Sequence, residues 1–147
     1  MFTASEVLYG TARGLLGQNL APGNEQLGCA QSLSYVCNKA FDDNLNIKAT
    51  TTFLDYLKKS DKWEQIYEVE PKCVIVSPTG EIPKGSPLSN GHIGIVGKLN
   101  ASDQSLYIMS NNSDLHYWDT QWTVKKWNDY YHVYGKIPTY YFRRLIV

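Results

Sequence analysis

The chain holds a cysteine whose context suits nucleophilic attack on a carbonyl carbon. Cys29 follows Gly28 and opens a run of apolar residues at helical spacing, so its thiol lies in the first turn of an expected helix. The unpaired amides and positive dipole end at this position favour thiolate, and the same amides can bind an oxyanion. Cys29 is therefore the candidate nucleophile, and its alternative role is inert packing in the core.

A histidine in a strand-like segment is the candidate base. His92 opens the apolar run His92–Val96 and is preceded by Gly91. Alternation along a strand places His92 and Gly94 on one face, where the glycine leaves space beside the imidazole. An imidazole in that space can hold a thiolate as an ion pair and later protonate a leaving amine. The alternative is a histidine bonded to backbone at a strand end.

An asparagine completes the candidate set. Asn111 lies in Met109–Ser113, at the end of the strand expected to pair with the one that carries His92. A side-chain amide bonded to the far ring nitrogen fixes the tautomer, as in Cys-His-Asn sites. A shift of one residue in strand register would give this role to Asn112. The same segment is also compatible with a turn.

These residues need helices and strands to bring them together. Helices are expected over residues 3–17, 29–41, a short stretch from Thr51, and 122–131. Strands are expected over Ile66–Val69, Cys73–Val76, His92–Val96, Ser105–Met109 and Thr139–Leu145, with an exposed loop over Ile82–Asn90. The third and fourth strands are expected to form a hairpin through a turn at 100–103. Helices followed by strands indicate an α+β fold, with the helices on one face of a central antiparallel sheet.

Length and charge restrict the class of protein. The 147 residues fit one domain spanning residues 1–147, and 43% of them are hydrophobic, enough to bury a core. Fourteen Lys and Arg residues balance fourteen Asp and Glu residues, so the net charge is zero. A neutral chain has no long-range field to attract nucleic acid, which argues against a nucleic-acid-binding protein.

Several kinds of site and segment are not indicated. Three cysteines do not make a disulfide framework, and Cys29 and Cys37 would stand about 12 Å apart on one helix, too far for a bridge. Only a pair that includes Cys73 stays open. No apolar run is long enough to cross a membrane, and no secretory signal begins the chain. No metal-ligand spacing or phosphate-binding loop is present, so no cofactor is expected.

Together these motifs resemble the papain-like peptidoglycan hydrolases of the NlpC/P60 and CHAP superfamily. The resemblance lies in the cysteine that opens the helix in Leu27–Val36, the later Gly-His strand, and the polar end of the next strand. It implies a papain-like NlpC/P60-type fold, with Cys29 as nucleophile, His92 as base, and Asn111 or Asn112 as orienting residue. Gly28 departs from the pattern, since many relatives carry an acidic or amide residue there.

The resemblance also implies an activity. It is the hydrolysis of an amide bond in the stem peptide or cross-bridge of peptidoglycan by a cysteine amidase or endopeptidase, through an acyl-enzyme. Trp118 and Trp122 belong to an aromatic segment expected to line the substrate groove, or else to pack the last helix on the sheet. Two other functions stay open: a non-catalytic module that binds cell wall or protein through this segment, and an acyltransferase or deamidase of the same fold.

Two biological contexts fit such an enzyme. Without a signal peptide it is expected to be made in the cytoplasm and to act on the cell wall after release, injection or lysis. A phage endolysin would be released through a holin, whereas an injected amidase effector would be paired with an immunity protein. The lack of a wall-binding domain favours the phage context.

Overall fold

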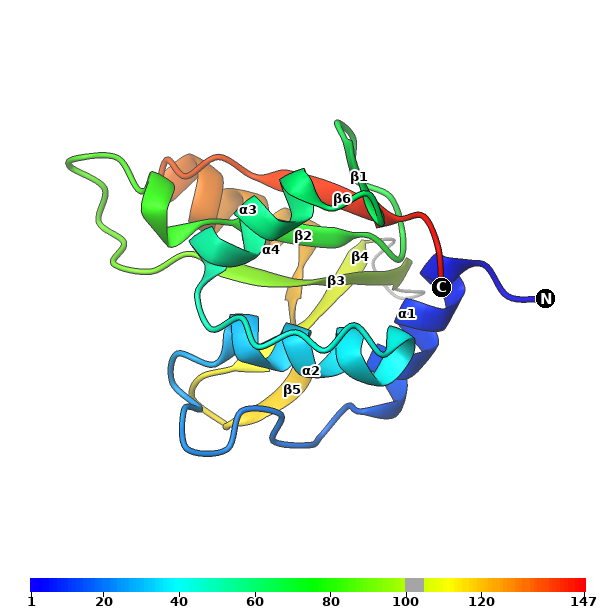
Figure 1. The fold of residues 1–147 in the computed structure, drawn as a ribbon. Coiled ribbons are helices and arrows are strands. Elements are labelled where there is room, and N and C mark those ends of the chain that lie inside the picture. The colour runs from blue at the N-terminus through cyan, green and yellow to red at the C-terminus, as the bar shows by residue number, and fades with distance from the viewer. Residues whose placement is uncertain (100–104) are drawn as a thin grey trace.

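The computed structural model describes residues 1–99 and 105–147, and its six strands form one antiparallel sheet (Figure 1). Their order across the sheet is β1-β6-β2-β3-β4-β5. The strands are β1 Trp63–Ile66, β2 Val74–Ser77, β3 His92–Leu99, β4 Leu106–Asn112, β5 Tyr117–Thr123 and β6 Tyr140–Arg144. The helices are α1 Ala4–Gly14, α2 Cys29–Phe41, α3 Thr50–Lys59 and α4 Val124–Trp127, which continues into the π-helical segment η2 Asn128–Tyr134. A single turn of 3-10 helix, η1, covers Thr79–Glu81.

The three N-terminal helices pack on one face of the sheet. Each helix buries one apolar stripe, represented by Leu8, Leu33 and Phe53, against strand residues such as Ile93 and Met109. The larger core lies between these layers. The expected α+β fold, with N-terminal helices packed on a central antiparallel sheet, is therefore confirmed.

The opposite face of the sheet is covered as well. Ile75, Val96 and Ile108 point away from the larger core. They pack with Trp127 of α4 and Tyr131 of η2. The expectation that the helices lie on one face is therefore wrong for the last helical segment. The physical reason is that β2 and β3 are apolar at both sets of alternating positions, so both faces need cover.

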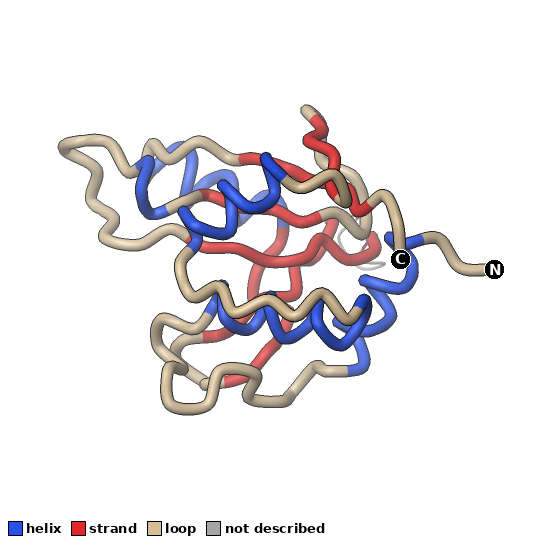
Figure 2. Tube along the Cα trace, in the orientation of Figure 1, coloured by secondary structure: helices blue, strands red, loops and turns tan. Residues whose placement is uncertain are grey.

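Several predicted elements are confirmed by the structure. The helix over Cys29–Phe41 has the predicted bounds, and α1 begins after Thr3, whose side chain and that of Glu6 form a capping box. Strands β3 and β4 pair as expected, with Ile95 opposite Met109. The turn predicted at 100–103 lies outside the described residues. The segment between η1 and β3 is a long loop that projects from the sheet (Figure 2).

Two strands differ from the prediction. The first strand covers Trp63–Ile66 rather than Ile66–Val69. This segment pairs with β6, and the ring of Trp63 at its start is buried in the core. Strand β5 was not expected, since its sequence is polar at most positions. It is held by pairing with β4, where Asn111 lies opposite Trp118. The first difference arises from a contact between segments far apart in the chain, and the second from a hairpin between neighbouring strands.

None of the helices within residues 1–99 and 105–147 is long and apolar enough to cross a membrane.

Candidate active site

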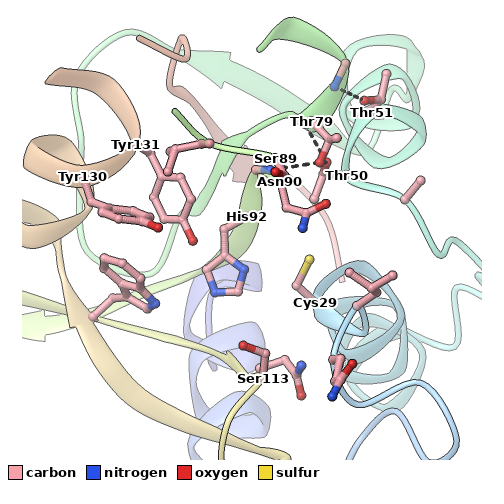
Figure 3. Close-up of a pocket in the computed structure, with 18 of the residues that line it drawn as sticks. Cys29, Thr50, Thr51, Thr79, Ser89, Asn90, His92, Ser113, Tyr130 and Tyr131 are labelled. Carbon is pink, nitrogen blue, oxygen red and sulfur yellow. Dashed lines mark hydrogen bonds between the residues drawn. The ribbon is translucent and has the colours of Figure 1, made fainter. Parts of the chain in front are cut away.

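The predicted nucleophile and base line one pocket at an edge of the sheet. The pocket has a volume of about 860 Å³ and lies where β2 ends, β3 begins and β4 ends. Cys29, His92 and Asn111 all contribute to its wall. Figure 3 shows the Cys29 sulfur and the His92 ring projecting into it from α2 and β3. The fold thus brings together residues that stand far apart in the sequence.

Cys29 is held at the first position of α2 by a close approach of the preceding loop. A side chain at Gly28 would bring a Cβ within 2.4 Å of the Ala21 Cβ and 2.5 Å of the Asn24 carbonyl oxygen, so the loop closes only on glycine. The thiol is partly buried and free. Gly28 is therefore needed for the position of the nucleophile.

The pKa of Cys29 is shifted in the direction opposite to the sequence expectation. Burial raises the pKa of the Cys29 thiol to about 11, against the lowering effect of the Ala30 and Ile93 backbone amides. Burial therefore opposes the thiolate that the helix start was expected to favour. The Ala30 amide belongs to that helix start and the Ile93 amide to β3, and the loss of water contributes more than they do.

His92 lies in an aromatic enclosure on the second face of the sheet. Its ring stacks on Trp127 at 5.1 Å between centroids and on Tyr131 at 5.9 Å. The residue is 8% exposed, and burial lowers the pKa of His92 to about 4. Burial thus shifts the pKa of both the imidazole and the thiol towards the uncharged form, against the ion pair expected from the sequence.

The group that orients His92 is a serine. His92 Nε2 lies 3.0 Å from Ser110 Oγ, and both side chains are buried. Ser110 lies on the His92 face of the sheet, next to Gly94, where an added Cβ would come within 3.0 Å of the Ser110 Cβ. The signal available from the sequence was the alternation that puts His92 and Gly94 on one face. The register of the β3–β4 hairpin, which brings Ser110 to that face, is set by the fold.

The two asparagines proposed for this role make other contacts. Asn111 Nδ2 donates to the Glu25 carbonyl at 2.8 Å, so the side chain faces α2, and its Oδ1 has no partner among the described residues. Asn112 donates to Asp119 and accepts from the amides of Asp114 and Leu115. Neither is bonded to His92. The predicted orienting contact is corrected to Ser110, because alternation along β4 turns Asn111 to the opposite face and the β4–β5 turn engages Asn112.

A network of threonines fixes the backbone that leads into His92. The Gly91 amide donates to Thr79 Oγ1 at 2.9 Å, and Thr50 Oγ1 donates to the same oxygen at 3.1 Å. Figure 3 shows these bonds at the wall of the pocket. A Cβ on Gly91 would stand 1.9 Å from the Ser77 carbonyl oxygen. The start of β3 is thus tied to α3 and η1.

The two tryptophans predicted to bind substrate lie in different places. Trp122 lines the pocket with Tyr130 and Tyr131, at 5.5 and 5.2 Å between ring centroids. Trp118 is fully buried, and its Nε1 donates to the Ala12 carbonyl at 3.0 Å. The prediction for Trp118 is therefore wrong, because its position on β5 turns the ring into the core beneath α1.

Over residues 1–99 and 105–147, no three His, Cys, Asp or Glu side chains are grouped so that they could hold a metal ion. Cys37 and Cys73 are buried free thiols. The pair that the sequence left open for Cys73 is therefore not formed.

Comparison with known proteins gives a likeness to a solved structure. No family model matches the chain, and no curated protein matches it. The chain is similar to a chain in the crystal structure of the type VI native effector-immunity complex Tae3-Tai3 from Ralstonia pickettii. The identity is 11%, the alignment covers 97% of this chain and 99% of the other, and the TM-score is 0.57. The likeness is one of fold.

Proposed function

We propose that the protein is a cysteine amidase that hydrolyses an amide bond in the peptide part of peptidoglycan. The observation that carries the proposal is the pocket shared by Cys29 and His92, with Ser110 bonded to the far nitrogen of the imidazole. A thiol, an imidazole and an orienting group are the components of a thiol acyl-transfer site.

The first half of the reaction begins from the neutral pair. A proton on Nε2 donated to Ser110 Oγ leaves Nδ1 as the basic nitrogen of His92. Nδ1 takes the thiol proton as the Cys29 sulfur bonds to the amide carbonyl carbon. The backbone amides of Ala30 and Ile93, which lower the pKa of the Cys29 thiol, would donate to the oxyanion.

The second half returns the enzyme to its starting state. The imidazolium gives its proton to the amide nitrogen, the carbon–nitrogen bond breaks, and an amine leaves. His92 then takes a proton from water as the hydroxide attacks the thioester, and the carbon–sulfur bond breaks. The thiolate regains the proton, and a carboxylic acid is released.

The lining of the pocket suits a short peptide with charged groups. Among the described residues that line it, Lys48 and Asp114 carry the ionised side chains, while Trp122 and Tyr130 provide flat apolar surface. A stem peptide offers carboxylates and amines to Lys48 and Asp114, and aliphatic segments to the two aromatic rings.

The structural likeness favours one biological context. The complex from Ralstonia pickettii pairs an effector with an immunity protein. A pocket with a thiol and an imidazole suits the effector rather than its inhibitor, so we infer that this chain corresponds to the effector. Delivery to the wall of a target cell and a partner immunity protein follow from that inference. The comparisons lend no support to the phage context that the sequence favoured.

Digestion of purified sacculi, with mass spectrometry of the released muropeptides, tests the proposal. The parent protein is expected to release products with a new amine and a new carboxylate, and Cys29→Ala and His92→Ala are expected to release none. Cys37→Ala, which removes a thiol of the same helix outside the pocket, is the matched control and retains activity. Circular dichroism establishes that each variant is folded.

Four outcomes would contradict the proposal. Hydrolysis by Cys29→Ala at the parent rate would show that the thiol is not the nucleophile. Release of ammonia without cleavage of the peptide would indicate a deamidase, and a new amide would indicate an acyltransferase. Retention on sacculi without any product would indicate a binding module.

A further inference from the structure

A second hollow lies beside α2, outside the pocket that holds Cys29. Its volume is about 410 Å³, and the two cavities share no lining residue within the described part of the chain. The hollow is bounded by residues 18–22, by α2, and by the segment that follows α2. Its lining consists of Gln18, Asn19, Leu20, Pro22, Gln31, Ser34, Tyr35, Asn38, Leu45 and Asn46.

The lining is polar but carries no charge. Charged residues make up 19% of the chain, yet none of the ten residues of the hollow is charged, and five are asparagine or glutamine. A side-chain amide offers both donors and an acceptor, a combination that matches a hydroxyl or an N-acetyl group. An ionic ligand would find no counter-charge here, so the chemistry favours a neutral ligand rich in hydroxyl groups.

Two of the amides hold the walls in place. Asn38 Nδ2 donates to the Leu45 carbonyl at 2.8 Å, and its Oδ1 accepts from the Leu45 amide at 2.6 Å. Asn19 Oδ1 accepts from the Ala21 amide at 3.0 Å. These bonds order the loops on both sides of α2, so the hollow exists before any ligand binds.

Other polar groups are left for a ligand. Gln18 and Asn46 are exposed, and their side chains have no hydrogen-bond partner among the described residues. Tyr35 is 44% exposed and stacks on no other ring in residues 1–99 and 105–147. A flat ring with a polar tip covers the apolar face of a pyranose, while amides bond the hydroxyls at its edge.

The start of α2 contributes to both the hollow and the catalytic pocket, on different sides of the helix. Gln31 follows Cys29 by two residues, a rise of about 3 Å along the helix axis. The loop before α2 contributes Asn19 and Pro22 to the hollow, and Gln26 and Leu27 to the catalytic pocket. A ligand that spans both cavities would cross this loop at the start of α2.

We propose that this hollow binds a neutral sugar of a glycan strand. Tyr35 would stack on the pyranose ring, and Gln18 and Asn46 would bond its hydroxyl and acyl groups. The choice of an N-acetylhexosamine rests on the proposed function, since peptidoglycan carries its stem peptides on such sugars. The sugar site would then hold the strand while a stem peptide enters the pocket of Cys29.

Nuclear magnetic resonance of the full chain, titrated with chitotetraose, tests the proposal. The titration uses Cys29→Ala, so that the result does not depend on hydrolysis. We expect saturable shifts in the side-chain amides of Gln18 and Asn46. Tyr35→Ala is expected to weaken binding about tenfold, the loss of one aromatic contact. Tyr67→Ala, which removes an exposed ring outside the hollow, is expected to leave the affinity unchanged.

Each contrary outcome has a distinct meaning. Absence of saturable shifts at millimolar chitotetraose would overturn the proposal, as would shifts confined to Trp122 and Tyr130, which line the catalytic pocket. Equal affinity for maltotetraose would overturn the assignment to N-acetylated sugars. Failure of the amidase assignment would appear in the sacculus digestion and would leave this titration unaffected, so the two failures are distinguishable.

Discussion

His92 Nε2 lies 3.0 Å from Ser110 Oγ, across two neighbouring strands of the sheet. The orienting partner of the imidazole is therefore a neutral hydroxyl rather than an amide or a carboxylate. A hydroxyl fixes the ring orientation but supplies no negative charge to stabilise an imidazolium. The low pKa of His92, which burial causes, persists beside such a partner.

Ser110→Ala is expected to lower kcat on peptidoglycan by about 10- to 100-fold, less than the roughly 10²–10⁴-fold that a general acid–base itself contributes, because the serine acts only through the orientation of His92. Without the hydroxyl, the ring loses the contact that selects its tautomer and orientation. Steady-state rates on a soluble stem peptide measure the effect. Ser5→Ala on α1 is the control for removal of a hydroxyl. Loss of activity in Asn111→Ala but not in Ser110→Ala would return the orienting role to the asparagine.

Alkylation of Cys29 by iodoacetamide is expected to be slow at pH 7 and to accelerate about tenfold per pH unit towards pH 10. The pKa of the thiol is about 11, so the thiolate fraction rises over this whole range. Mass spectrometry of the modified protein gives the rate, and Cys29→Ala corrects for Cys37 and Cys73. A rate that is already at its plateau below pH 7 would indicate a thiolate–imidazolium pair instead.

His92 is expected to make the protein less stable in acid. Its folded pKa is about 4, below the ordinary 6.5, so the unfolded chain binds the extra proton between these values. The stability contributed by the neutral ring is complete above pH 6.5 and falls by about 3 kcal/mol as the pH drops to 4.

Urea unfolding of the parent and of His92→Phe across this range measures the difference. The phenylalanine keeps a ring beside Trp127 but cannot take up a proton, so its stability should lack this component. The same dependence of the free energy of unfolding on pH in both proteins would show that His92 does not titrate as a buried group.

Gly91→Ala is expected to abolish most activity and to destabilise the fold by about 2 kcal/mol or more. The new Cβ would meet the Ser77 carbonyl oxygen, and relief of that contact would displace the start of β3 together with His92. Gly10→Ala in α1 is the matched control. Outside the backbone of its own helix, no atom of residues 1–99 and 105–147 lies within 4 Å of a Cβ added there, and the change should stabilise the helix by about 0.5–1 kcal/mol. Full activity in Gly91→Ala would contradict the proposal that the close contact of Gly91 with the Ser77 carbonyl positions His92.

Local patterns in the chain predicted the elements that carry the two principal residues. The apolar spacing after Gly28 predicted α2 with its observed bounds, and the run after Gly91 predicted the beginning of β3 at His92. Helix periodicity and strand alternation depend on neighbours within a few residues, so they are readable without a fold. The thiol and the imidazole were chosen from these positions alone.

Three further properties required the folded chain. Ser110 faces His92 because of the register between β3 and β4, and Trp118 lies in the core because β5 packs beneath α1. The pKa shifts of Cys29 and His92 towards their neutral forms follow from burial by segments remote in the chain. Strand register, face and loss of water are set by long-range contacts, and no spacing within a short stretch of residues encodes them.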